Sequence, residues 1–175
     1  MFNEKWCQRR LTDSAQHILA QIPSRAHDRG LLAVDSECIA MLALWSVLLW
    51  ERKVGLVAIE QTGVDRFDLI RGLDRLLVEK SSENPVAYDK ERNKFVFVKT
   101  QLAYDGWDFD DLLEPLLRQA EHEAKELGHE HVGSEHLVLA ILQVAAPVLS
   151  AILRQHGVSY ERVKDSVVRL LGPSG

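Results

Sequence analysis

Histidine side chains gather in one short part of the sequence, and their chemistry is that of a metal site. The cluster has four histidines with acidic neighbours: His122, His129, His131 and His136, with Glu126, Glu130 and Glu135. Imidazole binds transition metals, and His129-x-His131 would allow chelation. The spacing is not the His-Glu-x-x-His of helical zinc sites. We therefore predict structural or solvated histidines, no metal and no cofactor. A small metal-dependent hydrolase built on these histidines is the rival hypothesis.

Two serine–glutamate pairs, Ser36–Glu37 and Ser134–Glu135, stand where helices are expected to begin. A carboxylate in the first turn favours the positive end of a helix by about 0.3–1 kcal/mol. The same carboxylate could instead accept a guanidinium while free backbone N–H groups hold an anion. Asp35 weakens the first pair as an anion site, because its charge would repel an anion.

Cys38 follows the first of these pairs. A thiol near a helix start can be activated by a lowered pKa. Because no histidine occurs in its own motif, we predict a buried structural cysteine.

The apolar spacing predicts an all-α chain with one interruption. Helices are expected over about 12–26, 35–50, 54–62 and 65–78, and again over 110–127, 134–144, 147–157 and 159–171. Pro23 should kink or shorten the first. Between the two sets, residues 86–88 and 95–98 flank a charged turn and predict a β-hairpin.

The two sets of helices are copies of one plan. Four matched pairs lie 98 positions apart: Gly30 and Gly128, Val34 and Val132, Ser36 and Ser134, Glu37 and Glu135. Two later pairs, Gly63–Val64 with Gly157–Val158 and Leu76–Leu77 with Leu170–Leu171, lie 94 apart. Neither copy can bury its apolar face alone, so we expect a pseudo-twofold pair packed as one domain.

Composition narrows the class of protein. The chain has 175 residues, 46% hydrophobic and 27% charged, with a net charge of -5. That charge argues against nucleic-acid binding. Two cysteines make no disulfide framework. No apolar run is long enough for a membrane span, and the N-terminus lacks the apolar core of a signal peptide. We expect a cytoplasmic protein with no membrane partner; its oligomeric state stays open.

The segment 127–139, LGHEHVGSEHLVL, resembles the signature of the double Clp repeat domain at the N-terminus of Clp-type AAA+ unfoldases. Residues 148–158, VLSAILRQHGV, resemble the third helix of that repeat, and residues 12–19, TDSAQHIL, resemble its opening. In the first copy, Asp35 replaces the motif glycine and Cys38 the histidine. The Gly-x-x-x-x-Gly-Lys-Ser/Thr phosphate loop of an ATPase does not occur in the sequence, so we expect a stand-alone domain or a fragment.

The resemblance implies two four-helix Clp repeats, a degenerate one over 11–78 and a second over 110–172, joined by a linker over 79–109 with the hairpin. It also implies a non-enzymatic domain that recognises adaptors, degrons or substrates for a Clp unfoldase or protease. Some members bind phosphoarginine at positions that correspond to Glu37 and Glu135. Phe109 resembles the aromatic positions near the peptide groove, although a hydrophobic staple explains it equally well. A repurposed scaffold without peptide binding is the remaining alternative.

Overall fold

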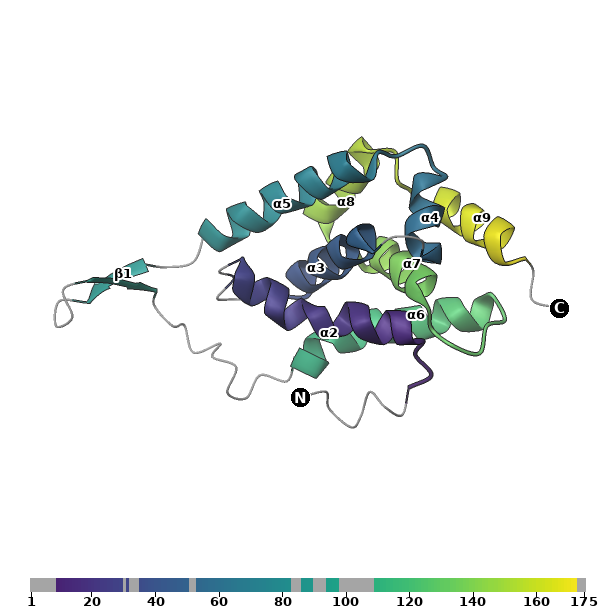
Figure 1. The fold of residues 1–175 in the computed structure, drawn as a ribbon, viewed down its shortest axis with the longest axis horizontal. Coiled ribbons are helices and arrows are strands. Elements are labelled where there is room, and N and C mark those ends of the chain that lie inside the picture. The colour runs from purple at the N-terminus through teal and green to yellow at the C-terminus, as the bar shows by residue number, and fades with distance from the viewer. Residues whose placement is uncertain are drawn as a thin grey trace.

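The computed structural model describes residues 9–29, 31, 35–50, 53–82, 86–89, 94–97 and 109–172. Over these ranges the chain forms eight helices and one two-stranded sheet. The predicted all-α class with a short hairpin is confirmed. Figure 1 shows a helical body, with the hairpin lying apart from it.

The first repeat contains α2 (Asp13–Asp28), α3 (Ser36–Leu49), α4 (Val54–Glu60) and α5 (Arg66–Ser82). Thr12 caps α2 by accepting a hydrogen bond from the backbone N–H of Ala15. Of the two effects expected of Pro23, shortening is wrong, because α2 continues to Asp28. A kink at the proline stays a prediction. Its buried stripe runs past the proline: Ala15, Ile18, Leu19, Ile22 and Ala26. Packing of this face outweighs the local cost of proline.

The second repeat contains α6 (Phe109–Glu126), α7 (Ser134–Val144), α8 (Pro147–Gln155) and α9 (Tyr160–Leu171). Helix α6 begins at Phe109 and carries Pro115 inside it. In Figure 1, α3 and α7 lie at the centre, with α5 and α8 on one side and α2 and α6 on the other. Both central helices are buried on most sides, as their continuous apolar sequences require.

The repeats interlock rather than stand side by side. Helix α4 packs on α7 and α9 of the other repeat, and α5 packs on α8. A parallel β-bridge joins Leu11 to Val132. Gly55 lies so close to α7 that an added Cβ would come within 2.7 Å of the backbone oxygen of Ser134. Contacts between repeats therefore bring together the starts of helices distant in sequence.

The hairpin consists of β1 (Val86–Asp89) and β2 (Lys94–Phe97), paired antiparallel with Val86 opposite Phe97. In the described part of the chain, no single helix is long and apolar enough to cross a membrane. Among the described helices, only α7 and α8 taken together meet that test, and they are bent by 114° at their junction. The division of the chain at residues 79–109 stays a prediction.

Candidate functional site

The start of α7 carries a chain of hydrogen bonds through two histidines. The backbone N–H of Gly133 donates to Nδ1 of His136 at 2.8 Å, and Nε2 of His136 lies 2.8 Å from Nδ1 of His129. Because a backbone N–H can only donate, Nδ1 of His136 is an acceptor and its proton sits on Nε2. That proton is donated to His129, which therefore carries its own proton on Nε2. Burial, with His129 nearby, lowers the pKa of His136 to about 4.

This network bears on the metal hypothesis. His129, Glu135 and His136 bring potential ligand atoms within 4.8 Å of one another. However, a metal on Nε2 of His136 would move the proton to Nδ1, where it would face the Gly133 N–H. The other two histidines of the rival cluster are exposed, and His122 pairs with Glu126 at 3.7 Å instead. The four histidines of the rival hydrolase therefore do not assemble into one site.

Glu135 lies beside this network with a largely buried side chain, 12% exposed. The Ser134 hydroxyl lies 3.3 Å from its carboxylate, and the same hydroxyl accepts a hydrogen bond from the backbone N–H of Gly55 at 3.1 Å. The missing Cβ of Gly133 makes room for the carboxylate, since an added Cβ would come within 2.2 Å of Oε1. Nδ1 of His136 lies 3.4 Å from Oε1 of Glu135, but it accepts the Gly133 N–H and carries no proton. Within the described residues, Glu135 has no lysine or arginine partner, so no cationic side chain compensates its charge.

The start of α3 is arranged differently. Asp35 caps the helix by accepting a hydrogen bond from the backbone N–H of Cys38 at 2.7 Å. Glu37 accepts one from the backbone N–H of Leu149, at the start of α8, at 3.3 Å. The Lys80 ammonium lies 3.2 Å from Asp35 and 3.5 Å from Glu37. Asp35 and Glu37 thus both have hydrogen-bond and ion-pair partners within the chain itself.

The pKa shifts of Lys80 and Asp35 follow from these contacts. The hydrogen bond to Asp35 is the main cause that raises the pKa of Lys80. Burial works against the charged form of Asp35, but hydrogen bonds from Cys38 and Lys80 outweigh it and lower the pKa of Asp35. Burial raises the pKa of the Cys38 thiol to about 12, which favours the predicted structural role, since a nucleophilic thiol needs a lowered pKa.

Three further residues, Ser36, Ser134 and Phe109, were predicted to bind peptide. Ser36 is exposed at the start of α3, and Ser134 is buried at the start of α7. Phe109 is the first residue of α6, and its side chain lies outside the described part of the structure. The structure thus associates Ser134 with Glu135, and binding at any of these residues stays a prediction.

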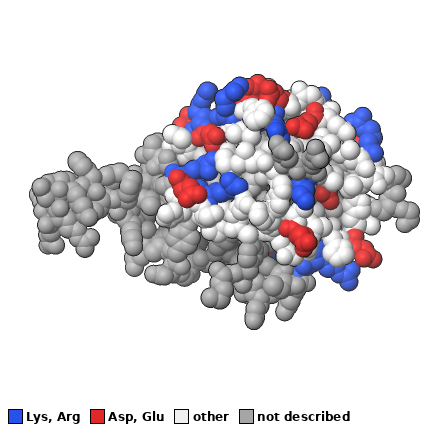
Figure 2. Space-filling view, viewed as in Figure 1, with Lys and Arg blue, Asp and Glu red and all other residues white. Residues whose placement is uncertain are grey.

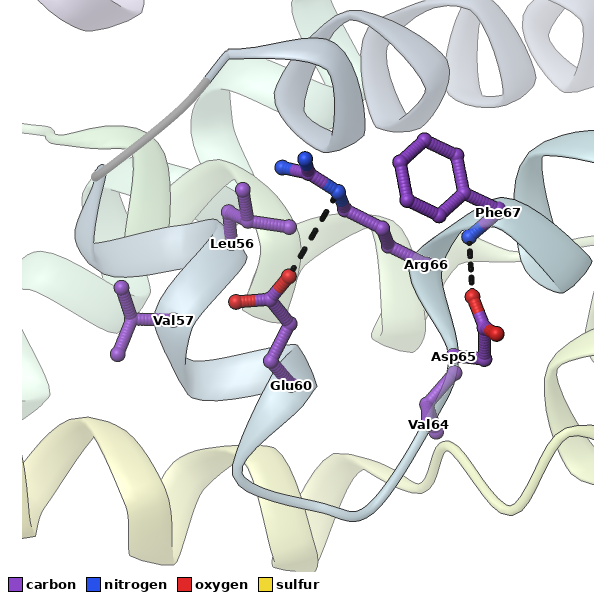
Figure 3. Close-up of a pocket in the computed structure, with 7 residues that line it drawn as sticks. All are labelled: Leu56, Val57, Glu60, Val64, Asp65, Arg66 and Phe67. Atoms are coloured by element: carbon purple, nitrogen blue, oxygen red, sulfur yellow. Dashed lines mark hydrogen bonds and ion pairs between the residues drawn. The ribbon is translucent and has the colours of Figure 1, made fainter.

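Sequence reasoning missed a pocket at the corner between α4 and α5 (Figure 3). Its volume is about 620 Å³, and it is lined by Leu56, Val57, Glu60, Val64, Asp65, Arg66 and Phe67. Phe67 is 56% exposed, and Figure 3 shows the Arg66 side chain between Phe67 and Glu60. On the face shown in Figure 2, acidic and basic side chains are interspersed.

The second half of the chain matches a known family. Residues 108–174 match the Clp repeat (R) N-terminal domain. Chaperone protein ClpC, chloroplastic, of Pisum sativum is 34% identical over 59 residues, which are 34% of this chain and 6% of that protein. The negative regulator of genetic competence ClpC/MecB of Bacillus subtilis is 38% identical over 50 residues, 29% of this chain and 6% of that protein. The matches thus span only a small part of these curated relatives.

Solved structures extend the likeness to both repeats. The Hsp104 N-terminal domain from Candida albicans has a TM-score of 0.61 at 16% identity, covering 94% of this chain and 93% of that chain. The N-terminal domain of ClpD from Arabidopsis thaliana has a TM-score of 0.57 at 11% identity, covering 93% and 94%. At these identities the likeness concerns the fold alone. The resemblance to the Clp N-terminal domain is confirmed, by sequence in the second repeat and by fold across the chain.

Proposed function

We propose that this chain is a non-enzymatic protein-binding domain. Residues 108–174 match the Clp repeat, and the fold is that of Clp N-terminal domains. Its partners are adaptors, degrons or substrate proteins of a Clp-type AAA+ unfoldase or protease. A cytoplasmic location belongs to the same proposal, although several relatives are named as chloroplastic.

The uncompensated carboxylate of Glu135 supports a peptide-binding role most directly. A largely buried charge is costly unless it is paired. Glu135 has the Ser134 hydroxyl as a partner but no lysine or arginine within the described residues. Nδ1 of His136 lies 3.4 Å from the carboxylate but carries no proton that it could donate. An arginine guanidinium from a bound peptide would supply the missing charge and two donors for the carboxylate.

Phosphoarginine is the finer version of this proposal. The first backbone N–H groups of a helix lack partners within the helix and favour an anion. At the start of α7 they lie next to the carboxylate of Glu135. A phosphorylated arginine would present its guanidinium to Glu135 and its phosphoryl oxygens to these N–H groups.

Calorimetric titration with a phosphoarginine peptide and its unmodified arginine counterpart tests both versions. Glu135→Gln should weaken binding by about 10- to 100-fold, the loss that follows from removing a charge-assisted hydrogen bond worth about 1.5–3 kcal/mol. The exposed Glu161→Gln, in the first turn of α9, is the matched control and should bind as the wild type does. Equal affinity of Glu135→Gln and the wild type would remove Glu135 from the proposal. A wild-type preference for the unmodified peptide would remove phosphoarginine.

A further inference from the structure

Glu37 and Glu135 are repeat-equivalent residues with the same burial and different partners. They lie 98 positions apart, each follows a serine, and each side chain is 12% exposed. Equivalent burial means that each carboxylate pays a similar desolvation cost and gains similarly from a cation. The difference therefore lies in what reaches each one.

Lys80 reaches the first carboxylate. It lies in the last turn of α5, and its ammonium is 3.5 Å from Glu37 and 3.2 Å from Asp35. The two carboxylates hold one cation between them, and the Lys80 side chain is only 28% exposed. The Leu149 N–H occupies another lone pair of Glu37 at 3.3 Å. A cation and a donor of the chain thus already serve Glu37.

At the corresponding positions, the second repeat has neither the lysine nor the second carboxylate. The 94-residue spacing that relates the last helices of the repeats leads from Lys80 to Ser174, which has no amine. The 98-residue spacing leads from Asp35 to Gly133, which has no carboxylate. Glu135 is left, in the described structure, without a lysine or arginine partner.

We propose that Lys80 is an internal occupant of the Glu37 site that excludes an external guanidinium, so that of these two described carboxylates Glu135 alone is open to an external cation. The inference rests on the proposed function, because it takes Glu135 to be the open site. An external cation would have to displace an ammonium tethered to the same molecule, whose effective concentration far exceeds that of a free peptide. Lys80 therefore sets how many peptides the domain binds.

The test measures the stoichiometry of phosphoarginine-peptide binding by calorimetry. The wild-type chain should bind one peptide, and Lys80→Met should bind two. Adding Glu37→Gln to Lys80→Met should return the count to one, which assigns the new site. Lys80→Arg keeps a cation in place and should bind one peptide. Lys125→Met, an exposed lysine on α6, is the matched control and should also bind one.

A second opening variant covers the case in which Lys80→Met fails to fold. Asp35→Asn removes one of the two carboxylates that hold Lys80, and asparagine remains a good N-cap. This variant should admit a second, weaker peptide. Thermal unfolding followed by circular dichroism establishes that each variant is folded.

The outcomes separate the two proposals. Two sites in the wild type, or a single site in folded Lys80→Met and Asp35→Asn, would overturn the role of Lys80 and leave the proposed function standing. Wild-type binding that survives Glu135→Gln would overturn the assignment of the open site. If neither the wild type nor the opened variants bind, the role of Lys80 and the phosphoarginine version of the proposed function both fail.

Discussion

At the scale of single residues, the two repeats cap their central helices in opposite ways. In the first, the Asp35 carboxylate accepts a hydrogen bond from the backbone N–H of Cys38. In the second, Gly133 donates its backbone N–H to the ring of His136. The cap partners at repeat-equivalent positions have exchanged donor and acceptor roles. Gly133 also leaves space for the Glu135 side chain, whereas Asp35 is one of the two carboxylates that form ion pairs with Lys80.

His136 predicts a pH dependence of stability. The folded pKa is about 4, against about 6.5 for an unfolded histidine. Between these values the unfolded chain binds a proton that the folded chain does not. The free energy of unfolding should therefore fall as the pH falls through this window, by about 3 kcal/mol in all, and show no such loss above it. Urea denaturation across the window measures the effect.

His136→Gln isolates the contribution of this side chain, because glutamine at this helix position can still accept the backbone N–H but does not titrate. The variant should lose most of the pH dependence within the window. The exposed His122→Gln should keep it. A wild-type dependence that survives in His136→Gln would assign the effect to other groups.

At the scale of elements, the contact between α4 and α7 holds the repeats together. Gly55→Ala would place a methyl group 2.7 Å from the backbone oxygen of Ser134, and neither helix can yield cheaply there. Overpacking of this kind destabilises by about 1–3 kcal/mol. The free energy of unfolding in urea should decrease by that amount.

Gly72→Ala, inside α5, is the matched control. Its added Cβ would have its nearest neighbour at 3.4 Å, the end of the His156 side chain. The helix gains about 0.8–1 kcal/mol in propensity from alanine, so the variant should be as stable as the wild type or more so. Similar losses in both variants would contradict a specific close approach at Gly55.

At the scale of the whole molecule, interlocked repeats predict cooperative unfolding. Helix α4 packs mainly on the second repeat, and Leu149 of the second repeat donates its N–H to Glu37 of the first. Neither repeat keeps these contacts alone. In a variant with Trp6 and Trp107 replaced by phenylalanine, the fluorescence of Trp45 and Trp50 reports on the first repeat. Its urea transition should coincide with the loss of the His136 NMR signals from the second. Separated midpoints would show independent units.

Local signals in the sequence specify the helical plan of the protein. Serine and aspartate caps, glycine stops and 3.6-residue apolar spacing placed helices such as α3 and α9 close to their observed starts, because these signals act within one or two turns of chain. The 98- and 94-residue spacings revealed the repeat for the same reason, since each copy preserves the same local signals. The sequence placed the first helix over about 12–26, and the local rule that proline shortens a helix failed there, because packing with α3 sustains α2 to Asp28.

Only the tertiary structure decided which chemically similar groups meet. Nothing local distinguishes Glu37 from Glu135, yet Lys80 reaches the first across 43 positions and no described lysine or arginine pairs with the second. Likewise His129 meets His136 while His122 and His131 remain exposed. These pairings depend on how whole helices pack, because a shift of one helix by a single turn would change every contact between them while leaving the local signals unchanged.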